Sequence, residues 1–236
     1  MTERRFHVDG ALEVGSTVAL TAGAARHARV LRLAPGDAVV LFDGRGREGE
    51  ATWLGDGAAR VSSVRESQEP WRVVLVVGLP KASALDSMLR GATEAGASEL
   101  RLFPAARSVS QPEPGRASHK LERARRVVEE AARQSERALV PALVLAPSLE
   151  EALAGRSPDA LLLALDARDG EDLERALFPS GREVWLVLGP EGGLDEDELA
   201  RLVASGARRV RAALPVLRVE TAAAVLTARA VLACAA

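Results

Sequence analysis

Five residues, Gly189-Pro190-Glu191-Gly192-Gly193, separate the apolar residues Leu188 and Leu194. Their composition is typical of a turn whose backbone groups bind a ligand. Glycines permit positive φ and let the chain approach a flat ligand closely, while the proline stiffens the turn. Backbone N–H and C=O groups held this way can hydrogen-bond the edge of such a ligand. A tight strand-to-helix connection without a ligand would explain the glycines equally well, so a second motif has to decide between the two.

The second motif is LPVLRVETA, which begins at Leu214 and leads into the last predicted helix. Its apolar residues would line one wall of a ligand pocket, and Arg218 and Glu220 place opposite charges where the loop turns into the helix. Glu220 and Thr221 are also ordinary residues for a first helical turn. A third segment, LLLALDARDG, would form the opposite wall of the pocket or simply be a buried strand.

Other nucleotide and catalytic signatures are missing. The run VVLVVG is followed by LPKASALD, which does not match the G-x-G-x-x-G pattern of a dinucleotide fold, and no P-loop pattern occurs. No histidine follows His119, so no Ser/His/Asp set is available near these motifs. The three histidines are far apart and Cys234 is the only cysteine, so we predict neither a metal site nor an internal disulfide.

The pattern of apolar and turn residues in this 236-residue chain changes near residue 70. Before it, short apolar runs separated by Gly, Asp and Pro favour a small β-rich domain. The polar stretch RESQEPW marks a boundary, and from Arg72 onward strands and helices alternate, which is typical of a parallel α/β sheet. Such sheets bind ligands at the carboxyl ends of their strands, where all three motifs fall.

Composition and charge further restrict the class of protein and its partners. The net charge is −2 and 47% of the residues are hydrophobic, so a large core is available and no global basic field marks a nucleic-acid partner. Between Arg101 and Val140, however, eight arginines and one lysine face five glutamates. This run is either a solvated helix face or an RNA surface. No run approaches 18 apolar residues and no apolar leader is present, so we expect a cytoplasmic protein without membrane contact.

The pair LVLGPEGGLDEDEL and, about 25 residues later, VLRVETAAAVL resembles the RsmE family of 16S rRNA uridine-N3 methyltransferases. RHARVLRLAPGDAVVLFDGRG is similar to the PUA-like domain of that family, and VVEEAARQSERALVP to the first part of its methyltransferase domain. The family belongs to the SPOUT class and uses S-adenosyl-L-methionine (SAM). Two positions depart from its pattern: the loop segment 213–215 lacks the usual glycine, and Glu136 replaces another glycine.

The resemblance implies a SPOUT α/β parallel sheet with a C-terminal deep trefoil knot (residues 71–236) and a small N-terminal PUA-like β-barrel domain that binds RNA (residues 1–70). It also implies a homodimer that acts on 16S rRNA in the small ribosomal subunit, without metal. A SPOUT enzyme that methylates another RNA, such as tRNA, is the main alternative. An RNA-binding module that has lost activity and a Rossmann-type dehydrogenase are weaker ones.

The resemblance also assigns site residues. The expected cofactor contacts are Leu163, Ala164, Leu165, Leu188, Gly189, Pro190, Glu191, Gly192, Gly193, Leu214, Val216, Leu217, Arg218, Val219 and Thr221. Arg218 would stabilise negative charge on the uracil, and Glu220 would accept the N3 proton or orient Arg218; Glu191 is a second candidate acid. The expected RNA contacts are Arg4, Arg5, His27, Arg29, Arg32, Arg107, Arg133, Gln134 and Arg137.

Overall fold

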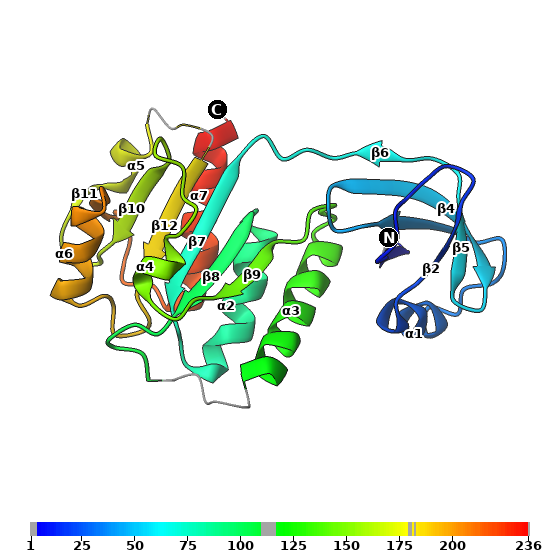
Figure 1. The fold of residues 1–236 in the computed structure, drawn as a ribbon, viewed down its shortest axis with the longest axis horizontal. Helices are drawn as coiled ribbons and strands as arrows, with labels where there is room; N and C mark the ends of the chain where they lie inside the picture. Colours follow the sequence, from blue (N-terminus) through cyan, green and yellow to red (C-terminus); the bar gives the residue numbers. More distant parts are fainter. Residues whose placement is uncertain (1–3, 110–116, 179–180, 182, 236) are drawn as a thin grey trace. The chain divides into compact units, whose positions relative to one another are not determined.

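The computed structural model describes residues 4–109, 117–178, 181 and 183–235 (Figure 1). Its contacts divide the chain into two compact units. The first comprises Met1–Glu69 and Ala132–Val140, and the second comprises Pro70–Ala131 and Pro141–Ala236. The break at residue 69 lies where the polar stretch occurs in the sequence. The nine residues from Ala132 to Val140, which the sequence placed in the second domain, cluster with the first unit instead.

The first unit is a six-stranded sheet with one short helix, α1 (Ala22–Val30). Its strand order is β1-β3-β4-β5-β2, with β6 paired to β4, and only the β1–β3 pair is parallel. The strands are β1 (Arg5–His7), β2 (Thr17–Ala19), β3 (Ala38–Phe42), β4 (Arg47–Gly55), β5 (Ala58–Val61) and β6 (Arg65–Glu66). Alternate residues of these strands point inward, and Phe6, Leu41, Trp53 and Val61 form a core with α1.

Residues 132–140 are attached to this sheet by backbone hydrogen bonds and an ion pair. The N–H of Gly46 donates to the Ala138 carbonyl at 3.1 Å, and the N–H of Val140 donates to the Gly44 carbonyl at 2.9 Å. The guanidinium of Arg137 donates twice to the carboxylate of Glu69, at 2.7 Å each. These contacts explain why the segment joins the first unit although it follows the long helix α3 (Ala117–Gln134) directly.

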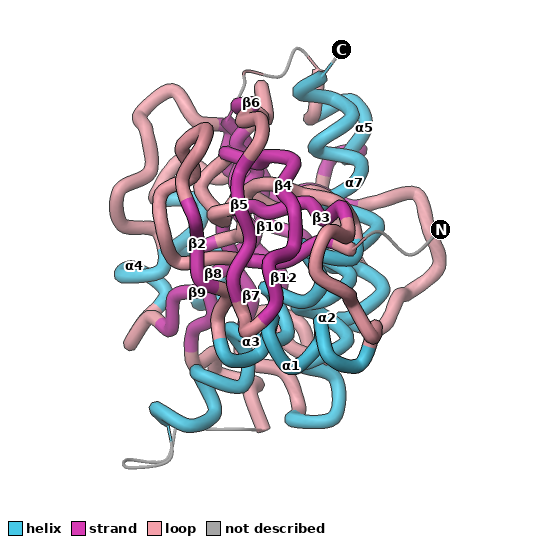
Figure 2. The backbone as a smooth tube through the Cα atoms, turned by 90° about the vertical axis from the view of Figure 1, so that its right-hand side faces the viewer, coloured by secondary structure: helices cyan, strands magenta, loops and turns pink. Residues whose placement is uncertain are grey.

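The second unit is built on a seven-stranded, fully parallel sheet, as the alternating pattern predicted (Figures 1 and 2). Its strand order is β11-β13-β10-β12-β7-β8-β9. The strands are β7 (Arg72–Gly78), β8 (Glu99–Phe103), β9 (Ala142–Leu145), β10 (Leu161–Leu165), β11 (Glu171–Asp172), β12 (Glu183–Leu188) and β13 (Arg208–Arg211). The helices besides α3 are α2 (Ala82–Glu94), α4 (Leu149–Ala152), α5 (Leu173–Ala176), α6 (Glu196–Ala204) and α7 (Val219–Ala235).

Both faces of this sheet are buried, which accounts for the uninterrupted apolar runs in β7 and β12. Val74, Val76, Trp185 and Val187 pack on one face with residues of α4 and α6. Helix α7 packs against β7 and β12 and also against α2. No described helix has both the length and the apolar character needed to cross a bilayer.

Candidate functional site

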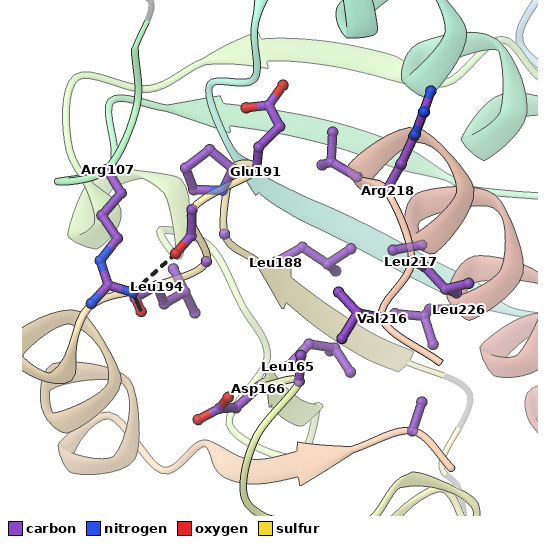
Figure 3. A pocket seen from close by; sticks show the side chains of 18 of the residues that line it. Arg107, Leu165, Asp166, Leu188, Glu191, Leu194, Val216, Leu217, Arg218 and Leu226 are labelled. Carbon is purple, nitrogen blue, oxygen red and sulfur yellow. Dashed lines mark hydrogen bonds between the residues drawn. The ribbon is translucent and has the colours of Figure 1, made fainter. Parts of the chain in front are cut away.

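A cavity of about 690 Å³ lies in the second unit, where β10 and β12 end and the loop before α7 begins (Figure 3). The three sequence motifs meet there. Of the predicted cofactor contacts, twelve line this cavity: Leu165, Leu188, Gly189, Pro190, Glu191, Gly192, Gly193, Leu214, Val216, Leu217, Arg218 and Val219. The other three do not. Leu163 and Ala164 are fully buried within β10, and Thr221 is exposed in the first turn of α7.

The turn from Gly189 to Leu194 is tighter than side chains would allow. A Cβ at Gly189 would lie 2.2 Å from the carbonyl carbon of Gly193 and 2.3 Å from the nitrogen of Leu194, so only glycine fits. Gly193 has φ +73° and its N–H donates to the Pro190 carbonyl at 2.8 Å, which closes the turn. The sequence therefore specifies this conformation at two positions rather than merely permitting it.

A third glycine, Gly78 at the end of β7, supports the turn from below. A Cβ there would lie 2.6 Å from Cδ of Pro190 and 2.7 Å from Cβ of Ala105. The prediction from sequence missed Gly78, although its position as the last residue of a buried apolar run was the available signal. Its absent side chain lets β7, the turn and the segment after β8 pack together at the carboxyl edge of the sheet.

Two charged side chains hold the turn from its sides. Oε1 of Glu191 accepts a hydrogen bond from the backbone N–H of Lys81 at 3.0 Å, at the N-terminal end of α2. Nη1 of Arg107 donates to the carbonyls of Gly192 and Leu194, at 2.9 and 3.0 Å (Figure 3). Glu191 therefore stabilises the first turn of α2, a role that suits a structural carboxylate better than a catalytic acid.

Helix α6 begins directly after the glycine turn, and acidic residues stabilise its N-terminus. Asp195 accepts from the N–H of Glu198 at 2.7 Å, and Glu198 accepts from the N–H of Asp195 at 2.9 Å, which is a complete capping box. Glu198 is only 2% exposed, and its other oxygen accepts from the N–H of Ala106 at 2.9 Å. This carboxylate thus ties α6 to the segment that carries Arg107.

The floor and the far wall of the cavity are apolar. Leu165, Leu188, Val216, Leu217 and Leu226 converge on the same space (Figure 3). Val216 is 84% exposed, so a large apolar side chain is open to a ligand that could cover it. Apolar walls beside a turn with accessible backbone groups suit a flat heterocycle such as adenine.

A charged group closes the edge of the cavity beside β10. Asp166 follows Leu165 directly; its carboxylate accepts from the N–H of Arg168 at 2.8 Å and from Nε of Arg209 at 2.9 Å. Burial of Asp166 favours its neutral form, but these donors outweigh that effect and hold the pKa of the carboxyl below its ordinary value. The prediction from sequence missed Asp166, although its position at the end of a buried strand was a usable signal.

The two predicted catalytic residues both line the cavity. Arg218 is exposed, its guanidinium has no hydrogen-bond or ion-pair partner among the described residues, and its side chain points away from the apolar wall (Figure 3). Glu220 is half-buried in the first turn of α7. An unpaired guanidinium at the rim of a cavity can stabilise negative charge on a substrate that enters it.

Two of the residues predicted to contact RNA, Arg5 and Arg137, are buried in ion pairs of the first unit. Arg5 is 3% exposed, pairs with Glu48 and lies with its guanidinium carbon 4.6 Å from the ring centre of Phe42. The side chain of Arg137 is 9% exposed and forms the bidentate pair with Glu69. Neither guanidinium is available to a phosphate, because each is buried and already paired with a carboxylate.

The remaining candidates differ in exposure. Arg29, Arg32 and Gln134 are exposed, and Arg133 is half-buried. Arg4 is partly exposed and pairs with Asp37 at 2.9 Å. His27 is half-buried, with its ring 5.9 Å from that of Phe6. Arg107 is exposed but holds the glycine turn, as described above. Within the described residues, no three His, Cys, Asp or Glu side chains are close enough together to hold a metal ion.

The parallel sheet, the glycine turn at its carboxyl edge and the apolar, backbone-lined cavity define an α/β domain that binds a nucleoside-type cofactor. A model of the RNA methyltransferase domain matches residues 67–231, and a model of the RNA methyltransferase PUA domain matches residues 20–52. The chain therefore belongs to the RNA methyltransferase family. The RNA methyltransferase and the PUA-like domain predicted from the sequence are thereby confirmed.

Individual relatives agree with this assignment. The chain is 36% identical to "Ribosomal RNA small subunit methyltransferase E" of Mycobacterium bovis, over 95% of this chain and 90% of that protein. It is 27% identical to the enzyme of that name from Neisseria gonorrhoeae, solved bound to S-adenosyl methionine, with a TM-score of 0.84 and coverage of 96% and 95%. A methyltransferase structure from Legionella pneumophila, 23% identical with a TM-score of 0.85, covers 98% of this chain and 97% of its own and shares the fold.

Proposed function

We propose that this protein transfers a methyl group from SAM to N3 of a uridine in 16S rRNA of the small ribosomal subunit. The names of its relatives support the RNA class, and the SAM-bound Neisseria structure supports the methyl donor. Within this chain, the observation that carries the proposal is the unpaired Arg218 at the rim of a cavity with a backbone-lined turn.

The cavity fits SAM in size and chemistry. Its volume of about 690 Å³ lies within the range of ordinary small-molecule sites. The N–H groups of Glu191, Gly192 and Leu194 donate to no partner within the described part of the chain, so they are available to an adenine edge. When bound, SAM supplies an electrophilic methyl group attached to a sulfonium, a chemistry that needs no metal.

The chain's own residues must position the uracil and manage its N3 proton. In this proposal Arg218 donates to a uracil carbonyl and stabilises the negative charge that develops on the imide. Glu220, two residues further on at the start of α7, accepts the proton or orients Arg218. Glu191 is engaged with α2, so we assign it no proton transfer. Holding the reacting groups in line supplies much of the rate acceleration, roughly 7–11 kcal/mol in favourable cases.

Replacement of Arg218 tests this mechanism. Arg218→Ala should leave SAM affinity within about threefold and lower the single-turnover methyl-transfer rate by about 10²–10³, the usual loss for one charge-stabilising donor. Arg218→Lys should recover little, because a point charge does not reproduce the planar fork. Higher pH should partly rescue Arg218→Ala, since alkali deprotonates N3 without help. A wild-type rate in Arg218→Ala would remove the residue from the mechanism, and loss of SAM binding would make it a structural part of the loop.

RNA recognition falls in this proposal to exposed arginines of the first unit, among them Arg29 and Arg32. If these side chains contact phosphates, affinity for RNA should fall steeply as salt rises. The double variant Arg29→Ala, Arg32→Ala should weaken RNA binding and flatten its salt dependence while leaving SAM affinity unchanged. Unchanged RNA affinity in that variant would exclude this surface as a phosphate contact.

We further propose that the protein is a homodimer, as the resemblance implies. Large apolar side chains that lie exposed on the second unit, including Phe178 at 54% and Leu232 at 60%, are candidate contacts for a second copy. Light scattering after size-exclusion chromatography should give twice the mass of the 24.9 kDa chain. A monomer at micromolar concentration would contradict this part of the proposal.

A further inference from the structure

Arg107 lies in the segment that follows β8 and reaches across to the glycine turn. Its side chain donates two hydrogen bonds from one nitrogen, Nη1, to the carbonyls of Gly192 and Leu194. The sequence predicted an RNA contact for this residue. Its position beside the cofactor turn indicates a different role, because a nitrogen that donates twice to the turn fixes the direction of two of its carbonyl groups.

The peptide planes that carry these carbonyls are also fixed at their N–H ends. The plane after Gly192 donates through the N–H of Gly193 to the Pro190 carbonyl at 2.8 Å. The plane after Leu194 donates through the N–H of Asp195 to Glu198 at 2.9 Å. Since each plane is held on both sides, the turn cannot rotate these peptides without breaking hydrogen bonds. The unpaired N–H of Leu194, which lies between these two planes, consequently keeps a fixed direction.

Arg107 is itself anchored close to the turn. The N–H of the preceding residue, Ala106, donates to buried Glu198 at 2.9 Å, and Ser108 accepts from the N–H of Ala105 at 3.2 Å. The aliphatic part of the side chain lies flat on Gly192, where an added Cβ would be 3.1 Å from Cβ of Arg107. Gly192 therefore provides space for Arg107, a role that the sequence had not assigned to this glycine.

We propose that Arg107 is a positioning residue that keeps the turn from Gly189 to Leu194 in the conformation that binds the cofactor. This inference rests on the proposed function of the turn as part of the SAM site. Without the two hydrogen bonds the turn samples other peptide orientations, and the apparent affinity for the cofactor falls by the fraction of molecules that retain the binding conformation. The effect is on cofactor affinity and not on the chemical step.

Calorimetry with S-adenosylhomocysteine in the absence of RNA tests this directly. Arg107→Ala should raise the dissociation constant about tenfold, a loss expected for partly exposed hydrogen bonds from a charged donor. Arg107→Lys should raise it by at least threefold, because one ammonium on a flexible stem does not hold both carbonyls in a fixed geometry. Arg90→Ala is the matched control: this exposed arginine on α2 has no partner among the described residues, and its removal should leave the affinity unchanged.

The kinetic pattern separates positioning from RNA contact. With SAM raised to saturation, Arg107→Ala should regain a transfer rate within about threefold of wild type, while KM for SAM rises in parallel with the dissociation constant. A folded Arg107→Ala with wild-type affinity for S-adenosylhomocysteine would overturn the inference, as would a loss confined to RNA affinity and its salt dependence. If Arg107→Ala does not fold, a wild-type dissociation constant in Arg107→Lys would overturn it. A wild-type protein that fails to bind S-adenosylhomocysteine would instead overturn the proposed function.

Discussion

Gly189→Ala is the most informative single change in this protein, because its consequence follows from the geometry of the turn alone. The added Cβ would lie 2.2 Å from the carbonyl carbon of Gly193 and 2.3 Å from the nitrogen of Leu194. Ordinary contact begins at 3.4 Å, so the backbone of the turn would have to move by about 1.2 Å. Both atoms belong to the main chain, and the peptides on either side are held by Pro190 and Arg107.

Overpacking of a well-packed site costs about 1–3 kcal/mol, and the upper end applies here because no flexible side chain can give way. If the turn moves, the cofactor loses its hydrogen-bond partners. A loss of about 3 kcal/mol in binding free energy corresponds to a dissociation constant raised roughly 150-fold. If the turn stays, the same strain lowers the free energy of unfolding. We therefore expect the losses in binding and in unfolding free energy to add up to about 3 kcal/mol.

Calorimetry with S-adenosylhomocysteine measures the first loss and urea unfolding measures the second. Gly181→Ala is the control, since nothing lies within 4 Å of a Cβ at that position, and it should change neither quantity. If Gly189→Ala binds the cofactor like wild type and unfolds at the same urea concentration, the close approach described for this turn does not exist.

Three further predictions concern single carboxylates. Glu191→Gln should methylate its substrate at a rate within about threefold of wild type, because the amide oxygen still accepts a hydrogen bond from the Lys81 N–H. Glu191→Ala removes this acceptor at the start of α2 and should lower the free energy of unfolding by about 0.5–2 kcal/mol. A large rate loss in Glu191→Gln would restore Glu191 as a candidate catalytic acid. Glu136→Gly should raise the unfolding free energy by up to about 1 kcal/mol, because Glu136 has φ +58° where glycine is preferred, and a lower urea midpoint would contradict this. The depressed pKa of Asp166 means that its stabilising effect is present above the unfolded pKa of about 3.9 and is lost as pH falls through the folded pKa. The stability difference between wild type and Asp166→Asn should therefore shrink in strong acid, and a constant difference down to pH 2 would refute the assignment.

The parallel sheet and the position of the candidate site could be predicted, because both follow from short, contiguous segments of the sequence. Uninterrupted apolar strands such as β7 and β12 indicate burial on both faces, and the glycines after β12 indicate a backbone binding turn. The small N-terminal domain followed from turn residues and the resemblance. The trefoil knot and the cytoplasmic location stay predictions.

The details that escaped prediction depend on residues far apart in the chain. Arg5 and Arg137 looked like surface arginines, and only their partners Glu48 and Glu69 show that they are buried. Exposed and buried arginines are indistinguishable by spacing in a chain where arginine provides nearly all the positive charge. The role of Arg107 depends in the same way on carbonyls 85 and 87 residues away.

The Glu136 turn illustrates an intermediate case. The sequence shows a departure from a usual glycine, and the structure shows what replaces it. The N–H of Arg137 donates to the Ala132 carbonyl at 2.9 Å and that of Glu136 to the Arg133 carbonyl at 3.4 Å. This is a Schellman ending of α3 with a glutamate in the left-handed position. The departure is therefore accommodated by local strain and not by a different path of the chain.

The central claim is tested most directly by mapping the methyl group. Small ribosomal subunits that lack the modification are incubated with the protein and SAM, and the RNA is digested for nucleoside mass spectrometry and probed by reverse transcription, which stops where N3 methylation blocks pairing. We predict one SAM-dependent 3-methyluridine in 16S rRNA, none in tRNA, and none with Arg218→Ala on the same timescale. A methyl group found in tRNA instead, or on another atom of the 16S nucleotide, would contradict the account.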